Sequence, residues 1–424
     1  MVYVWSASGT PPTQCPNNSE HTIDASNATV MQTVTQTDTE ISNLPLTPFD
    51  RVLTSEETVL IDVKPGMGLS ALRDRVDTVG GGSVTSEVGT WEYQLTAPNA
   101  ASSASLRTAE RGPFVAGLCA EVGIGGRLGS FPQGDQTVRY GAFDNVSGNG
   151  YFFEIGAIGI SVVVMKDGAE KHRAHMTQFN VDAMDGAGPS KLVLDALRGY
   201  AWTIRYAMYG YGCVEFSVAA ENINLEQHLV PMHRYYTRSD PAISCPYLPV
   251  WVEAASPSHD TPLDVFVTGR KLSILGSYDP DTRDTCVCHD VSTANADLGF
   301  TTILAVRKRA LCDSMPVEIT EIECSADGGG AVLVEAVMGI VSETNVWSSI
   351  DGIPATETVL EAACDTEVAI TERVSLWRGY VHASSQKPTS MRTHLSEDSA
   401  ILLRVKNISA AGRVAVSLRF REWW

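Results

Sequence analysis

The chain has 424 residues, 44% of them hydrophobic and 19% charged, so it is long enough for two or three globular domains with separate cores. Its net charge of −19 and pI of about 4.8 argue against a nucleic-acid partner, because phosphate contacts need clustered Lys and Arg. No window holds the roughly 18 uncharged apolar residues of a membrane span, and the N-terminus is too short and uncharged for a signal peptide.

Residues 1–45 are rich in Ser, Thr and Asn and carry few large apolar side chains. Such a segment cannot bury enough area to offset its own ordering entropy. This composition predicts an extended N-terminal arm that lies on a neighbouring chain or domain, or alternatively an unanchored tail.

Residues 46–104 are predicted to form a connecting segment with one short helix. In the stretch 68–76, Leu69, Leu72 and Val76 fall at i, i+3 and i+7, which is the spacing of an amphipathic helix. The glycines at 80–82 would end it.

Residues 105–275 alternate strand-like runs with Gly, Pro, Asn or Asp about every ten residues. Because no long helical segments separate the runs, they predict an antiparallel β-sandwich of the jelly-roll or lectin-like kind. The most informative run is 139–154, where Asn149-Gly150 can take the positive φ of a tight hairpin. The glycines of 123–129 resemble a nucleotide-binding fingerprint, but no helix follows them, so we expect a glycine-rich loop.

Residues 276–424 are predicted to form a second antiparallel β-sandwich, after a polar, turn-rich boundary at 276–285. In its last strand Val414, Val416, Leu418 and Phe420 alternate onto one face. The chain ends in Trp423-Trp424, and two terminal indoles are costly to expose, so we expect them to dock on a core or a neighbouring subunit. The predicted fold class is therefore all-β, with two sandwiches.

Nine cysteines, an odd number spread along the chain, argue against a complete disulfide framework, so most should be reduced and buried. Cys286-Val-Cys-His289 offers zinc-binding residue types. However, the C-x-C-H spacing is not a usual structural pair, and no second pair lies at a finger-like distance. A disulfide between Cys286 and Cys288 would be strained. We therefore expect structural roles here, with no metal and no cofactor.

Several runs of residues together resemble virion structural proteins of tailed phages and of large double-stranded DNA viruses. The resemblance rests on Val138–Asp144, Gly150–Glu154, Gln178–Ser190 and Tyr209–Gly212, and more loosely on the closing strands Ala400–Glu422. It covers residues 105–275 well and 276–424 loosely. It implies a β-sandwich component of a capsid, tail or fibre, located in the virion, and it implies no chemistry.

Four loop carboxylates are candidate site residues: Asp144, Glu154, Asp182 and Asp185. If they converged at one end of the sandwich, they could serve a glycosidase or bind Ca²⁺. Asp182-Ala-Met-Asp185-Gly lacks the alternating acidic pattern of a calcium loop, and Asp or Asn before Gly normally forms turns. We therefore expect turn-forming roles and assign no catalytic residue.

An aromatic-rich zone offers a second set of candidates. Strand alternation should bury about half of its rings, so we favour core and subunit interface over a sugar-stacking surface. Its members are Tyr206, Tyr209, Tyr211, Tyr235, Tyr236, Tyr247 and Trp251, and the candidates for interface or glycan contact are Tyr209, Tyr211, Tyr235, Tyr236, Trp423 and Trp424.

These observations favour a non-enzymatic structural component of a virus particle, which works by packing against copies of itself, with a trimer expected, and against other virion proteins. The alternative is a carbohydrate-binding adhesin or receptor-binding module of a tail or fibre, whose partner would be a host surface glycan. A glycan-degrading enzyme that uses Glu154 and Asp185 is the least favoured hypothesis.

Overall fold

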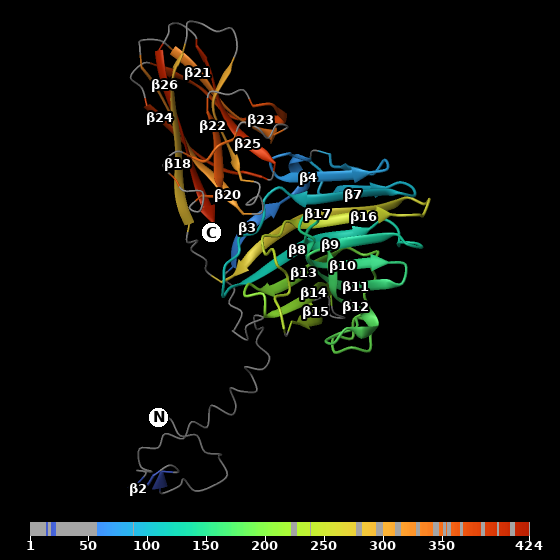
Figure 1. The fold of residues 1–424 in the computed structure, drawn as a ribbon. Coiled ribbons are helices and arrows are strands. Elements are labelled where there is room, and N and C mark those ends of the chain that lie inside the picture. Colours follow the sequence, from blue (N-terminus) through green and yellow to red (C-terminus); the bar gives the residue numbers. More distant parts are fainter. Residues whose placement is uncertain are drawn as a thin grey trace. The chain divides into compact units, whose positions relative to one another are not determined.

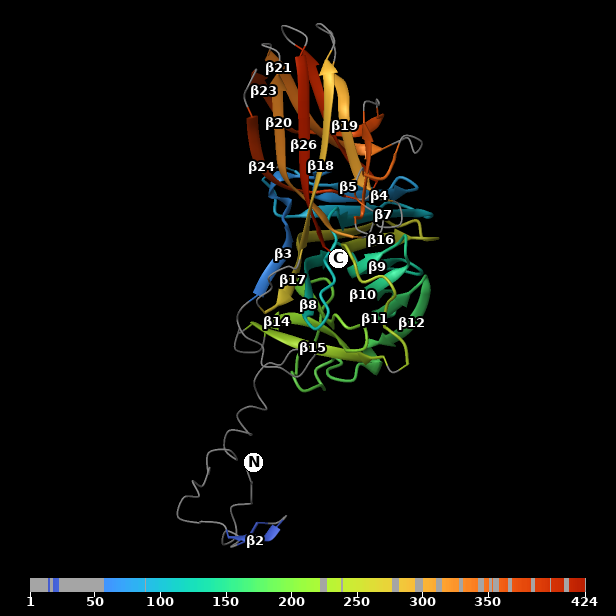
Figure 2. The same ribbon diagram turned by 60° about the vertical axis from the view of Figure 1, so that its left-hand side comes forward.

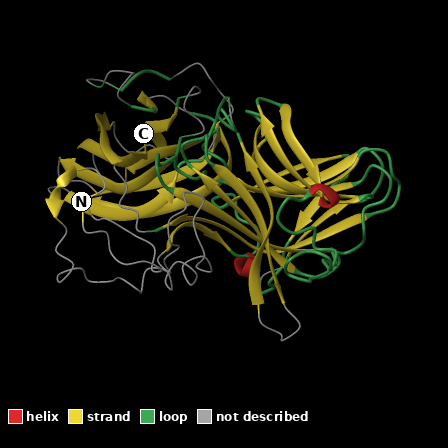
Figure 3. Cartoon of the chain, turned by 90° about the horizontal axis from the view of Figure 1, so that it is seen from below, coloured by secondary structure: helices red, strands yellow, loops and turns green. Residues whose placement is uncertain are grey.

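The computed structural model describes residues 14–15, 18–22 and most of 57–423. Within the last range it leaves out residues 88, 222–226, 238, 277–281, 294–299, 310–314, 328–330, 342–346, 351–352, 354–357, 365–367, 383–385, 397 and 408–411. The described residues are almost entirely strands (Figure 3), joined in antiparallel pairs. Their helical segments are the 3₁₀ turns η2 (Pro65–Met67) and η3 (Met176–Gln178), neither long nor apolar enough to cross a membrane.

Residues 54–424 form one compact unit, and its first part is a sandwich of two sheets (Figure 1). Among the described residues, one sheet has seven strands in the order β12 (Ala169–His175), β11 (Gly159–Lys166), β10 (Asn149–Gly156), β9 (Thr137–Asp144), β16 (Val250–Ser256), β7 (Ser102–Thr108) and β4 (Asp74–Val79). The other follows the order β15 (Gln227–Tyr236), β14 (Cys213–Glu221), β13 (Tyr200–Ala207), β8 (Cys119–Leu128), β17 (Leu263–Leu275), β6 (Tyr93–Ala97) and β5 (Ser83–Thr85), and β3 (Glu57–Val63) also pairs with β17.

Aromatic rings from both sheets meet in the core of this first sandwich. Phe153 of β10 packs against Trp202 and Phe216 of the opposite sheet, with ring centroids 5.1 and 5.3 Å apart. Side chains alternate along a strand, so burying Phe153 places its neighbours Phe152 and Glu154 on the outer face of the sheet.

The second part is another two-sheet sandwich. Its sheets have the orders β18-β26-β20-β24 and β22-β19-β25-β21-β23, and the first is seen as adjacent strands in Figure 2. The predicted alternation of the last strand is confirmed, since Val414, Val416, Leu418 and Phe420 are all buried. The all-β fold class is therefore confirmed. The strand bounds are β18 (Thr282–Thr293), β19 (Thr301–Lys308), β20 (Val317–Asp327), β21 (Ala331–Val341), β22 (Leu360–Cys364), β23 (Ile370–His382), β24 (Gln386–His394), β25 (Ser399–Asn407) and β26 (Gly412–Trp423).

The prediction of a short helix at residues 68–76 is wrong. A turn occupies 71–73, and β4 then pairs with β7 in an antiparallel register. A helix of about nine residues is marginal alone, whereas the strand gains a full ladder of hydrogen bonds. The segment 46–104 is also more than a connection, because β3, β4, β5 and β6 belong to the two sheets of the first sandwich.

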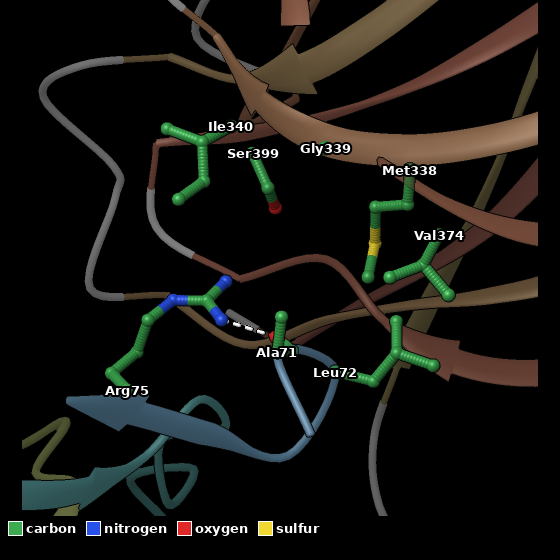
Figure 4. Close-up of a pocket in the computed structure, with 8 residues that line it drawn as sticks. All are labelled: Ala71, Leu72, Arg75, Met338, Gly339, Ile340, Val374 and Ser399. Atoms are coloured by element: carbon green, nitrogen blue, oxygen red, sulfur yellow. Dashed lines mark hydrogen bonds between the residues drawn. The ribbon is translucent and has the colours of Figure 1, made fainter. Parts of the chain in front are cut away.

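Leu69, Leu72 and Val76 do not form one buried face, although their spacing fits a helix. Leu72 packs against the core cluster of the second sandwich, and Figure 4 shows it with Ala71 and Arg75 opposite Met338 and Val374. Leu69 and Val76 are both more than one-third exposed, so the three residues do not share one buried helical face.

Two glycine predictions also differ from the structure. The β9–β10 hairpin turns at residues 145–148 with Gly148 at φ 65°, while Asn149 and Gly150 already belong to β10. The expected glycine-rich loop lies largely within β8. There a Cβ added at Gly126 would lie 2.7 Å from the Tyr140 ring, and one at Gly125 would lie 2.2 Å from Oγ1 of Thr268, so packing demands the glycines.

Of residues 1–45, for which an extended arm is expected, the structure describes β1 (Gln14–Cys15) and β2 (Asn18–Thr22), which pair antiparallel. The rest of that segment lies outside the described residues. Trp423 ends β26, where it pairs with Thr282, and Trp424 is not described.

The turn glycines allow a matched stability test. Gly148→Ala places a Cβ 2.3 Å from the Gly168 nitrogen, whereas Gly168→Ala, also at positive φ (76°), meets nothing within 4 Å. We expect Gly168→Ala to cost about 1–2 kcal/mol for its φ alone. Gly148→Ala should cost at least about 2 kcal/mol more, because backbone must move. Urea unfolding of both variants measures the difference in the free energy of unfolding. Equal losses would contradict the close approach of Gly148 to the Gly168 backbone.

Candidate functional site

Three exposed tyrosines lie around one turn at an end of the first sandwich. Tyr209 and Tyr211 are on the turn between β13 and β14 and are 59% and 57% exposed. Tyr236 ends β15 and is 58% exposed. It pairs in register with Cys213, two residues after Tyr211, so the three tyrosines lie within about one strand spacing of the same turn. We call these three residues the tyrosine platform.

The turn that carries the platform is fixed by its neighbours. Gly210 takes φ 77°, and its carbonyl accepts a hydrogen bond of 2.8 Å from the Ala242 amide. The Tyr209 hydroxyl lies over Gly117, where an added Cβ would come within 3.0 Å of it. The loops around residues 117 and 242 therefore hold the turn from two sides.

A buried ion pair anchors the same end of the sandwich. Arg111 donates to Asp144 at 3.0 Å and to the Tyr247 carbonyl at 2.8 Å, and both charged side chains are almost completely buried. Burial by itself would raise the pKa of Asp144, but hydrogen bonds from Arg111 and Ser147 outweigh it, so that pKa is lowered. The ion pair thus ties three loops together.

The Asn149 amide connects two further turns at this end. Its oxygen accepts from the Ser244 amide at 2.9 Å, and its nitrogen donates to the Ser147 carbonyl at 2.9 Å and to Asp167 at 3.3 Å. Asn149 is fully buried, so this network holds the loops without help from solvent. The platform therefore stands on a preorganised base, which lowers the entropy cost of binding.

Asp240, in the loop that contacts Gly210, is paired with a lysine of β11 and a lysine of β12. Asp240 accepts from Lys166 at 3.0 Å and from Lys171 at 2.8 Å. Those hydrogen bonds lower the pKa of Asp240, so it is a carboxylate at neutral pH. The rim of the platform thus offers both hydrogen-bond donors and acceptors.

The candidate carboxylates each have local partners. Glu154 pairs with Arg139 at 2.8 Å and Arg173 at 2.7 Å on the outer face of its sheet. Asp182 accepts from the amides of Met184 and Ser190 at 2.8 and 2.7 Å. Asp185 accepts from the Ala187 amide at 2.9 Å. Asp144, Asp182 and Asp185 thus accept hydrogen bonds from backbone amides in turns, whereas Glu154 lies within β10 and not in a loop.

Tyr235 differs from its neighbour Tyr236. Its ring packs on His172, with centroids 4.6 Å apart, and it borders the core of the sandwich. His172 and His233 face each other with their Nε2 atoms 2.9 Å apart and ring planes 17° apart. The ring that accepts must be neutral, and burial lowers the pKa of both His172 and His233, so both rings are neutral at pH 7. Tyr235 therefore supports the edge of the sandwich.

A groove of about 500 Å³ lies on the outer face of the second sheet of this sandwich. Its floor includes Gly125, Ala201 and Ala219. Two charged residues in its lining are paired with each other, since Arg127 binds Glu92 through two hydrogen bonds of 2.9 and 2.8 Å. Tyr200 in its lining packs against the core. The groove thus lacks an exposed ring, which the tyrosine platform provides.

Among the residues that the structure describes, no group of three or more His, Cys, Asp or Glu could hold a metal ion. The sequence pattern pointed to the tyrosines, but not to Arg111 or to the role of Asn149 in linking the loops of their base. An Arg directly preceding Gly112-Pro113 was the available signal for Arg111.

No protein-family model and no curated protein matches the chain. Solved structures similar to it include the Emp47p carbohydrate recognition domain, at 10% identity and TM-score 0.33 over 52% of this chain and 98% of that one. Rv0315, a pseudo beta-1,3-glucanase of Mycobacterium tuberculosis, is 11% identical with a TM-score of 0.36 over 52% of this chain and all of that one. The VIP36 exoplasmic/lumenal domain in its Ca²⁺/Man3GlcNAc-bound form is 14% identical, with a TM-score of 0.33, over 53% of this chain and 93% of that one.

Breaking the buried ion pair should destabilise the sandwich. Arg111→Met leaves the Asp144 carboxylate buried without its cation, and we expect a loss of about 3–5 kcal/mol at pH 7. Adding Asp144→Asn should recover much of that loss, because the uncompensated charge is removed. Urea unfolding of both single variants and the double variant gives the coupling energy. Purely additive losses would show that the pair does not anchor the loops.

The histidine pair should make stability depend on pH. Burial and the neighbouring His172 lower the pKa of His233 from 6.5 to about 4. Between those values the unfolded chain binds a proton that the folded chain does not, so stability should fall as pH drops from 6.5 to 4. His233→Gln should reduce that loss by about 2 kcal/mol. The measurement is urea unfolding at pH 7 and 4.5, and His228→Gln, at the exposed start of β15, is the control. If His233→Gln lost as much stability between the two pH values as the unchanged protein, His233 would not be the group responsible.

Proposed function

We propose that the first sandwich is a carbohydrate-binding module and that the tyrosine platform binds sugar rings. Three aromatic rings kept more than half exposed on a rigid base are the observation that carries the proposal. A soluble surface normally hides such rings unless they meet a partner. Tyrosine suits sugars because its face packs on C–H groups while its hydroxyl forms hydrogen bonds.

The polar rim complements the hydroxyl groups of a sugar. Asp240 can accept hydrogen bonds, and Lys166 and Lys171 can donate them. Both lysines also form ion pairs with Asp240. The whole chain carries a net charge of −19, which repels polyanions. The expected ligands are therefore neutral glycans, with sulfated or sialylated ones disfavoured. Binding requires no bond to be broken, and the proposed role is non-enzymatic.

The proposed module is compatible with a receptor-binding part of a tail or fibre. The virion location, a trimeric assembly and packing against other virion proteins stay predictions from the sequence. The size of the purified chain in solution tests the assembly directly.

Glycan binding is tested on an array of neutral and acidic glycans, followed by calorimetry with the strongest ligand. Tyr209→Ala, Tyr211→Ala and Tyr236→Ala should each weaken binding about tenfold, which corresponds to about 1.4 kcal/mol. Tyr380→Ala is the matched control, because Tyr380 is also 58% exposed but lies on β23 of the second sandwich. Its affinity should be unchanged.

A folded protein that binds no glycan on the array would overturn the proposal. So would binding that survives all three platform substitutions, because the sugar would then occupy another surface. Near-ultraviolet circular dichroism of each variant confirms that the core aromatics keep their packing.

A further inference from the structure

Two cysteines lie side by side on an exposed face of the second sandwich. Along β18 the burial alternates: Thr285 and Val287 are buried, while Cys286 and Cys288 are exposed. The two exposed side chains lean together, and their Sγ atoms are 3.3 Å apart. Both cysteines are free thiols.

The strand holds these sulfurs close but opposes a bond between them. Cys286 pairs with Arg419 and Cys288 with Ser417 in a register with β26 that continues without a bulge from Thr282 to Thr293. Residues two apart on a strand have Cα atoms about 6.6 Å apart. A disulfide needs Cβ atoms about 3.5–4.5 Å apart, which the alternating strand does not favour. An ion that bridges the sulfurs imposes no such approach of the Cβ atoms.

The number of ligands restricts which ion fits. His289 follows in sequence, but alternation places it on the opposite face of β18 from the thiols. Among the described residues, no third His, Cys, Asp or Glu completes a group with them. Structural zinc takes four ligands, so two thiols are a poor zinc site. Thiolates are soft ligands that select ions such as Cu(I).

We propose that Cys286 and Cys288 form a two-thiolate binding site for a soft monovalent metal ion of the Cu(I) class. The site is independent of the tyrosine platform and lies in the other sandwich. A surface hollow of about 290 Å³, lined by Cys288, Glu323 and Ser417 among others, gives an ion access to Cys288.

Binding is an exchange of protons for metal. Each thiol loses its S–H proton to solvent, two Cu–S bonds form, and no electrons are transferred, so one Cu(I) releases two protons. Because both thiols must lose a proton to bind the ion, affinity should increase with pH.

The test is an anaerobic titration of the reduced full-length chain with Cu(I), in competition with a chromogenic Cu(I) chelator. We expect one Cu(I) per chain, detected also as a thiolate-to-copper absorption band. Cys286→Ser and Cys288→Ser should each weaken binding at least about 100-fold, since losing one of two ligands should exceed the usual 10–100-fold cost of an outer-shell change. Cys364→Ser is the control, because Cys364 is also an exposed thiol.

Three results would overturn the proposal. The first is unchanged Cu(I) affinity in both Cys286→Ser and Cys288→Ser, and the second is an equal loss in Cys364→Ser. The third is a parallel Zn(II) titration with comparable affinity at the same cysteines, which would require ligands that the two-thiol site does not have. Urea unfolding of each variant separates a lost ligand from a lost fold.

Discussion

The contact of Phe153 with Trp202 and Phe216 joins the two sheets of the first sandwich in the middle of its core. Large rings bury more apolar area than any other side chains, so they decide which face of each strand turns inward. Because side chains alternate strictly, this choice also decides the outward set. Glu154 and Arg139 are thereby left on the outer face, where they pair with each other.

The proposed binding end shows how rigidity and exposure are combined. Arg111 with Asp144 and the amide of Asn149 fix several loops through buried polar contacts. A buried ion pair adds little net stability compared with apolar packing, but it penalises any other loop arrangement, because a single unpaired charge would be left behind. Such a base lets the tyrosines stay exposed without collapsing onto the protein. The polar network thus fixes the arrangement of the loops more than it raises the free energy of unfolding.

The thiol pair and the tyrosine platform follow from the same rule of strand alternation. Val287 is pulled into its core, which places Cys286 and Cys288 outward on the same side. Tyr235 packs toward the core and Tyr236 consequently points to solvent. In both places one buried residue decides the exposure of its neighbours, so a conservative change in the core could alter a surface site.

The sequence by itself determined the all-β class and the burial pattern of the last strand, because alternation and turn residues are local signals. Tertiary structure decided the rest. Residues 68–76 fit a helical spacing, but pairing with β7, about thirty residues away, made a strand of their last three residues. The glycines of β8 predict a loop from sequence alone. The reason that no side chain fits there is the close approach of Tyr140 and Thr268, which come from other parts of the chain. The partners of Asp144 and of the tyrosines likewise come from distant loops, and contacts between residues far apart along the chain leave no periodic mark in the sequence.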